Sequence, residues 1–300
     1  MKKTIAVTDI GSNTIKIRVF GYENGKLEEE AAESRLCRLI SRIENGKLSK
    51  EGIDLICGTL TDYRTLAQKH GAESFSAFAT ASLRRAENRE SVIKEVKKRC
   101  GVDIDLLSGE EEASLSFYGA VGYLGKKAGD GCLFDMGGGS TEIIPFIKGE
   151  PVDRTSLPFG ALSLYMKYLS KDGFSKTGFE GIRNEVRSFL EKSGIKDVSE
   201  NGFLVGGTAL ATEKLINVFF GAKTDGGNVD ALLVHLLFEK LSEGGREVEE
   251  TLEKYVPDRK DTVVSGCCAF SEMLKLLGVK KAAFLKNSLR EGYAYKRVLL

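Results

Sequence analysis

The chain has 300 residues, of which 42% are hydrophobic and 29% charged, and its formal net charge at pH 7 is +1. This length suits two domains of about 150 residues each, and the near-zero charge excludes an overall field that would attract nucleic acid. Lys2 and Lys3 precede only a few apolar residues, and no apolar run approaches the ~18 residues of a membrane span. We therefore expect a cytoplasmic protein without nucleic-acid or membrane partners.

Short strand-like segments alternate with longer segments of helical periodicity, as is typical of α/β proteins. In the first half we expect a strand hairpin over 5–20, helices over 48–70, 88–99 and 108–123, and strands over 75–79 and 102–107. In the second half we expect a strand hairpin over 132–146, a strand over 203–205 that leads through glycines into a helix, and a terminal helix over 289–300. The six cysteines form no CxxC pair, which predicts reduced, mostly buried thiols.

A glycine-rich stretch between Gly119 and Gly131 contains five glycines and marks the expected boundary between two lobes. We place the lobes at residues 1–124 and 125–300, with the terminal helix able to pack back on the first lobe. Proline is scarce, with four residues in the chain, so we expect no long proline-rich linker.

One phrase occurs twice, as IAVTDIGSNTIKIRVF at 5–20 and CLFDMGGGSTEIIPF at 132–146. Aligning Asp9 with Asp135 without gaps also pairs Gly11 with Gly137. Two later apolar residues pair with identical ones, Ile17 with Ile143 and Phe20 with Phe146. Each copy has an apolar run, an Asp, a turn of small residues and a second apolar run, which predicts two strands around a turn whose backbone N–H groups can bind an anion. The duplication predicts two related lobes that face one another across a phosphate and a cation.

Five motifs in fixed order resemble those of the Ppx/GppA phosphatases, the exopolyphosphatases and guanosine pentaphosphate phosphatases. They are DIGSNT at 9–14, ATASLRRAEN at 79–88, SGEEEA at 108–113, DMGGGSTE at 135–142 and GGT at 206–208. The resemblance implies an actin-like fold of the actin and sugar-kinase type, with two ribonuclease-H-like lobes and an active-site cleft between them. It also implies that homodimers are common among relatives.

The resemblance assigns a role to each motif. Glu112 would be the general base and Arg84 would neutralise phosphate, while Asp135 and Glu142 would hold Mg²⁺ or its water shell. Phosphate binding falls to residues of three glycine turns: Asp9, Gly11, Ser12, Asn13, Thr14, Gly137, Gly138, Gly139, Ser140, Gly207 and Thr208. A plain hairpin turn at Asp9, a solvated strand position for Glu142 and helix-dipole complementation by the acidic run at 110–112 remain open alternatives.

Two segments depart from the family pattern. RLCRLISRIENGKLS at 35–49 lacks expected glycines, and KNSLREG at 286–292 has Lys286 and Ser288 in place of an expected Asp and Gly. The chain is similar to short family members, so we expect no helical C-terminal extension.

We therefore expect an exopolyphosphatase acting on short inorganic polyphosphate. Hydrolysis of guanosine pentaphosphate (pppGpp) is the alternative within this chemistry, and a catalytically weak polyphosphate or alarmone sensor is the alternative outside it. An actin-like kinase is disfavoured by Glu112.

Overall fold

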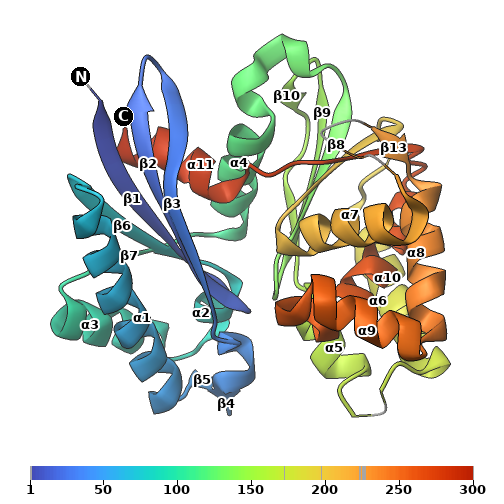
Figure 1. The fold of residues 1–300 in the computed structure, drawn as a ribbon, viewed down its shortest axis with the longest axis horizontal. Helices are drawn as coiled ribbons and strands as arrows, with labels where there is room; N and C mark the ends of the chain where they lie inside the picture. Colours follow the sequence, from blue (N-terminus) through green and yellow to red (C-terminus); the bar gives the residue numbers. More distant parts are fainter. Residues whose placement is uncertain (1, 172, 197, 223, 225–227, 300) are drawn as a thin grey trace. The chain divides into compact units, whose positions relative to one another are not determined.

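The computed structural model describes residues 2–171, 173–196, 198–222, 224 and 228–299. The chain divides into two compact units, Met1–Gly119 with Leu289–Leu300, and Ala120–Ser288 (Figure 1). The boundary predicted at 124/125 lies inside a 3₁₀-helical segment of the second unit, Gly122–Ala128. Residues 289–300 group with the first unit. The sequence-based division had included them in the second lobe, with the terminal helix able to pack back on the first.

A five-stranded sheet of order β3-β2-β1-β6-β7 forms the first unit. Its strands are β1 (Lys3–Ile10), β2 (Thr14–Glu23), β3 (Lys26–Leu36), β6 (Ser74–Ala79) and β7 (Ile104–Leu106). β1 is antiparallel to β2 and parallel to β6, so the first two strands form the predicted hairpin. A short strand pair, β4 (Ile43–Glu44) and β5 (Lys47–Leu48), precedes the first long helix.

Helices of the first unit include those predicted over 48–70, 88–99 and 108–123, together with the short helix α2, which was not predicted. They are α1 (Lys50–Lys69), α2 (Ala81–Arg85), α3 (Arg89–Cys100), α4 (Gly109–Ala120) and α11 (Leu289–Tyr293). α1 begins where the Ser49 side chain accepts a hydrogen bond from the Gly52 N–H, and it buries Ile56, Leu60 and Tyr63 at helical spacing. The expected terminal helix is α11 followed by a π-helical turn, Ala294–Val298, and in Figure 1 α11 lies beside the strands of this unit.

A seven-stranded sheet with the same central order forms the second unit, β10-β9-β8-β12-β14-β13, with β11 paired to β9. Its strands are β8 (Gly131–Met136), β9 (Thr141–Ile147), β10 (Glu150–Pro151), β11 (Thr155–Leu157), β12 (Asn201–Val205), β13 (Val229–Asp230) and β14 (Lys281–Phe284). β8 is antiparallel to β9 and parallel to β12, as β1 is to β2 and β6. The two units therefore repeat one topology.

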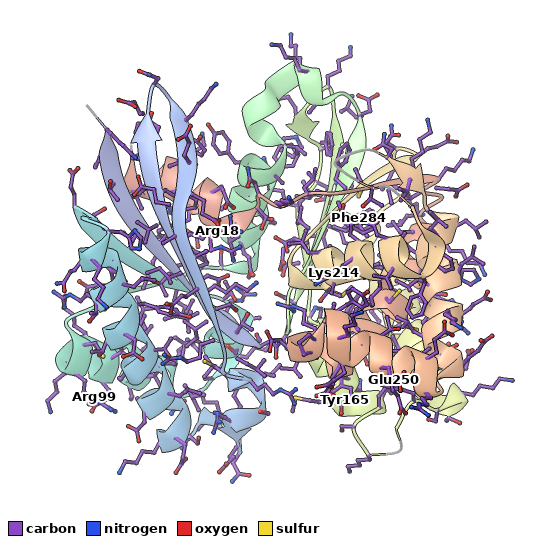
Figure 2. All side chains as sticks on the ribbon, in the orientation of Figure 1. Arg18, Arg99, Tyr165, Lys214, Glu250 and Phe284 are labelled. Atoms are coloured by element: carbon purple, nitrogen blue, oxygen red, sulfur yellow. The ribbon has the colours of Figure 1, made fainter. Side chains whose placement is uncertain are left out.

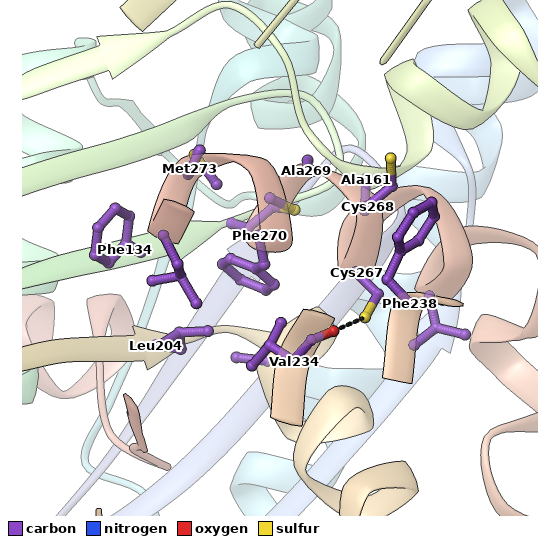
Figure 3. Packing of buried hydrophobic residues seen from close by; sticks show 14 of the residues in the cluster. Phe134, Ala161, Leu204, Val234, Phe238, Cys267, Cys268, Ala269, Phe270 and Met273 are labelled. Carbon is purple, nitrogen blue, oxygen red and sulfur yellow. Dashed lines mark hydrogen bonds between the residues drawn. The ribbon is translucent and has the colours of Figure 1, made fainter. Parts of the chain in front are cut away.

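Helices of the second unit pack around α10, which is buried on every face from Thr262 to Leu274. They are α5 (Ala161–Tyr168), α6 (Lys176–Ser193), α7 (Gly207–Phe220), α8 (Leu232–Glu243), α9 (Arg246–Tyr255) and α10 (Lys260–Leu276). Figure 3 shows Cys267 of α10 beside Val234 of α8, whose carbonyl accepts from its thiol at 3.5 Å. Burial raises the pKa of Cys267 well above its usual value, so this thiol is a packing group.

Candidate active site

The two hairpin turns close in the same way. In the first, Ile10 pairs with Ile15 across four turn residues, and the Gly11 N–H donates to the Thr14 carbonyl at 3.2 Å. In the second, Met136 pairs with Thr141 across four turn residues, and the Gly137 N–H donates to the Ser140 carbonyl at 3.0 Å. The gap-free alignment of the two copies is therefore confirmed in the strand register.

Each turn is held from its carbonyl side. The Asn13 carbonyl accepts from the N–H groups of Cys37 and Arg38, at 2.9 and 2.8 Å. The Gly137 and Gly138 carbonyls accept from the first N–H groups of α5, at 3.0 and 2.9 Å. Because a trans peptide directs its C=O and N–H to opposite sides, the amides joined to these carbonyls point away from the supporting segment. Such an arrangement of N–H groups suits an anion.

Gly160 lets the second turn lie directly on α5. A Cβ at this position would come within 2.6 Å of the Gly137 carbonyl oxygen and of the Gly139 nitrogen, so only glycine fits here. In the first turn, Ser12, Asn13 and Thr14 are all buried, and the Asn13 Oδ1 has no hydrogen-bond partner within the described part of the chain. A buried amide side chain in that situation suits a polar ligand.

Asp135 and Glu142 form a buried carboxylate pair. They lie directly opposite one another in the β8–β9 register, so their side chains share one face of the sheet. Asp135 is 8% exposed and Glu142 1%, and Ser156 of β11 donates to Glu142 Oε1 at 2.7 Å. Two like charges opposite one another destabilise a sheet, and buried charge is costly. A divalent cation bound here would offset both costs.

Two glycines directly after β12 lie against residues of the site. Gly206 has a φ of +94°, and a Cβ there would come within 3.1 Å of Asp135 Oδ1. At Gly207 a Cβ would meet the Arg259 guanidinium at 2.1 Å, so glycine makes room for this arginine. Thr208 is buried in the first turn of α7 with its methyl group toward Gly266. The second unit thus brings together the predicted metal residues, the Gly137–Ser140 turn and the Gly207–Thr208 turn.

Arg84 and Glu112 contact one another in the first unit. The Arg84 Nη1 donates to Glu112 Oε2 at 2.9 Å and to the Leu107 carbonyl at 2.8 Å. Glu112 is only 6% exposed, whereas the neighbouring Glu110 is exposed. The guanidinium therefore orients the carboxylate that the sequence predicted to be the base.

Glu111 has a separate role at the start of α4. Its Oε2 accepts from the Ser108 N–H at 2.9 Å, while the Glu111 N–H donates to Ser108 Oγ at 3.1 Å, which is a capping box. These bonds and Arg297, whose Nη2 lies 2.6 Å from Glu111 Oε1, lower the pKa of Glu111. The acidic run thus contains one exposed residue, one cap and one buried carboxylate.

Asp9 lies beside two cations of its own unit. Lys16 is opposite it in the β1–β2 register, and Arg290 Nη1 is 3.3 Å from Asp9 Oδ2. Burial nevertheless raises the pKa of Asp9, against the opposing effects of Arg290 and Lys16. Sequence reasoning gave no role to Arg290 or Arg259. The only signal for Arg290 was its place in the LREG segment at 289–292, which resembles a family motif.

The donor set of the second unit fits Mg²⁺. Among the described residues, no group of three or more Asp, Glu, His or Cys side chains gathers as a metal cage. Mg²⁺ keeps most of its water ligands and needs only one or two carboxylates, so the buried oxygen donors of Asp135 and Glu142 are a suitable set.

Within the described ranges, no helix is long and apolar enough to span a membrane.

A family model described as the Ppx/GppA phosphatase family matches residues 23–300. The chain belongs to this family. Exopolyphosphatase 1 of Mycobacterium tuberculosis is 27% identical over 303 residues, which cover 98% of this chain and 88% of the relative. Exopolyphosphatase 2 of the same species is 32% identical over 197 residues, 62% of this chain and 61% of the relative. Membership in the Ppx/GppA family supports phosphatase activity.

Solved structures share the fold. An exopolyphosphatase from Cytophaga hutchinsonii superposes with a TM-score of 0.85 at 22% identity, covering 98% of this chain and 97% of that one. An Aquifex aeolicus Ppx/GppA enzyme has a TM-score of 0.76 at 25% identity, covering 97% and 98%. Together with the repeated sheet order, these similarities confirm the predicted α/β fold with two lobes of the actin type.

Proposed function

We propose that this Ppx/GppA family member is a Mg²⁺-dependent exopolyphosphatase that releases the terminal orthophosphate of short inorganic polyphosphate. The buried pair of Asp135 and Glu142, opposite one another on adjacent strands, carries the proposal. A family of phosphatases and relatives named exopolyphosphatase support the choice of substrate.

Asp135 and Glu142 would hold the metal, which supplies charge neutralisation at the phosphate oxygens when bound. The N–H groups of the Gly137–Ser140 turn and the start of α7 would bind other phosphate oxygens. Gly11 to Thr14 would bind phosphate in the same way from the first hairpin. Phosphoryl transfer depends mainly on positioning and charge, which backbone donors supply without reorganising.

Glu112 would take a proton from the attacking water. The new bond forms between that water oxygen and the terminal phosphorus, and the bond from phosphorus to the bridging oxygen breaks. The products are orthophosphate and a chain shorter by one unit. Arg84 keeps the Glu112 carboxylate in place through the 2.9 Å contact and can offer its remaining N–H groups to the phosphate.

Phosphate release from tripolyphosphate, long polyphosphate, pppGpp and ATP tests this proposal. We expect Glu112→Gln to lower the rate on tripolyphosphate by ~10²–10⁴-fold, the usual effect of removing a general base. Glu110→Gln is the matched control, because Glu110 is exposed and lies two residues before Glu112 on α4. This variant should keep the wild-type rate. A wild-type rate in Glu112→Gln, or activity that does not require Mg²⁺, would contradict the mechanism. Preference for pppGpp would replace polyphosphate as substrate, and tight binding without turnover would indicate a sensor.

A further inference from the structure

Arg290 is a buried cation beside Asp9. This aspartate precedes the Gly11–Thr14 turn, which we call the first phosphate turn. Arg290 is 8% exposed, and its Nη1 lies 3.3 Å from Asp9 Oδ2. Within the described part of the chain, its buried Nε has no hydrogen-bond partner. Burying a guanidinium with an unsatisfied N–H group lowers the free energy of unfolding. A residue that destabilises the fold in this way is a candidate for a functional role.

The Asp9 carboxylate connects Arg290 to the turn. Its Oδ2 faces Arg290, and its Oδ1 lies 3.6 Å from where a Cβ of Gly11 would be. The carboxylate therefore lies between the arginine and the first glycine of the turn. Lys16 and Glu291 are the other charged groups that act on Asp9.

The segment that carries Arg290 is itself held firmly. Glu291 Oε1 accepts from Arg18 Nη1 at 3.0 Å, and Arg18, labelled in Figure 2, also contacts Glu29 of β3. Gly292 packs so closely on α4 that a Cβ would come within 1.8 Å of the Leu115 carbonyl oxygen. α11 is thus anchored to both the hairpin and the helix of Glu112, which gives the Arg290 side chain a defined origin.

We propose that Arg290 is a positioning residue for the first phosphate turn. It holds Asp9 in one orientation over Gly11 and so keeps the N–H groups of the Gly11–Thr14 turn in place for a phosphate. The inference rests on the proposed function, since that function places phosphate at this turn.

Two variants of Arg290 test the role, with Lys296→Met as the control. Lys296 is exposed, lies in the same C-terminal segment and loses the same charge. We expect Arg290→Met to lower kcat/KM for tripolyphosphate by ~10–100-fold, as loss of a supporting partner commonly does. Arg290→Lys keeps the charge and should recover part of that loss, whereas Lys296→Met should remain near wild type. Equal losses in Arg290→Lys and Arg290→Met, or no loss in either, would overturn the proposal.

Binding to a hydrolytically silent protein separates this inference from the proposed function. In a Glu112→Gln background, calorimetry with tripolyphosphate should show binding that is ~10-fold or more weaker with Arg290→Met and unchanged with Lys296→Met. This result supports the role of Arg290 even if the wild-type chain releases no phosphate, and unchanged binding overturns it. If Arg290→Met is unstable, Asp9→Asn should raise the thermal midpoint more in the Arg290→Met background than in the wild type, because it removes the stranded carboxylate. Equal gains in the two backgrounds would refute the contact between the two side chains.

Discussion

The two hairpins share a sequence phrase and a turn but differ in the charges around the leading aspartate. Asp9 faces Lys16 across its strand pair and contacts Arg290, so two cations of the protein lie beside it. Asp135 faces Glu142 across its strand pair and lies against Gly206. The equivalent strand positions of Lys16 and Glu142 thus distinguish a carboxyl group with protein cations beside it from a carboxylate pair that suits a metal ion. Backbone geometry was duplicated, while the chemistry of the two copies diverged.

The largest expected difference concerns Mg²⁺. Glu142→Gln should lower phosphate release by on the order of 100-fold and abolish the rise in thermal midpoint that Mg²⁺ produces, because it removes half of the carboxylate pair. Lys16→Gln, at the equivalent position of the first hairpin, should keep the Mg²⁺-dependent rise. Thermal unfolding with and without Mg²⁺ measures both. A metal response that disappears with Lys16→Gln and survives Glu142→Gln would reverse the assignment.

A second difference concerns the strand beside each hairpin. Phe78 of β6 and Val205 of β12 hold equivalent register positions, so Ala79 corresponds to Gly206, the residue directly after β12, which has a φ of +94°. Gly206→Ala should lower the free energy of unfolding by about 1–3 kcal/mol, because a Cβ would come within 2.9 Å of the Met136 carbonyl oxygen in a strained conformation. Gly221→Ala is the control, since it has a positive φ but open space around it, and its cost should be smaller. Equal costs, measured by urea unfolding, would show that the contact with Met136 is unimportant.

The smallest effect depends on pH. Because the pKa of Asp9 is raised in the folded state, the folded chain binds more protons than the unfolded one between the two pKa values. The stability penalty of Asp9 is therefore absent below its unfolded pKa of about 3.9 and complete above its folded pKa. Asp9→Asn should gain stability relative to wild type as the pH rises from 4 to 8. A difference between the two urea midpoints that stays constant over this range would contradict the raised pKa.

Local patterns predicted the two hairpins and the helices over 48–70, 88–99 and 108–123, but gave no prediction for β3 or for the helices α5, α6 and α8 to α10. The alternation of apolar residues and the Asp-Gly turns are contained within 16 neighbouring positions, so β1, β2, β8 and β9 could be located from the chain alone. The acidic run at 110–112 could also be located from the chain alone. Only the structure shows that Glu111 caps α4 and that Glu112 is buried.

Contacts between distant parts of the chain could not be predicted in this way. Arg290 reaches Asp9, and Arg259 packs on Gly207, through folds of the chain that no local pattern encodes. Gly160 is another example, because its need for glycine comes from the close approach of Gly137. The division of the chain had the same weakness. Composition marked a glycine-rich boundary, but it left open whether the terminal helix packs on the first lobe, and only the structure groups residues 289–300 with that unit.

That late addition to the first unit has a consequence for synthesis. At about 5–20 residues per second, the roughly 170 residues of the second unit take about 10–30 s to emerge before Leu289 does. During this interval the apolar cluster of Ile5, Val7, Phe20 and Phe78 lacks Leu289 and Tyr293, and Asp9 lacks Arg290. The lobe that the ribosome makes first is therefore the lobe that finishes folding last.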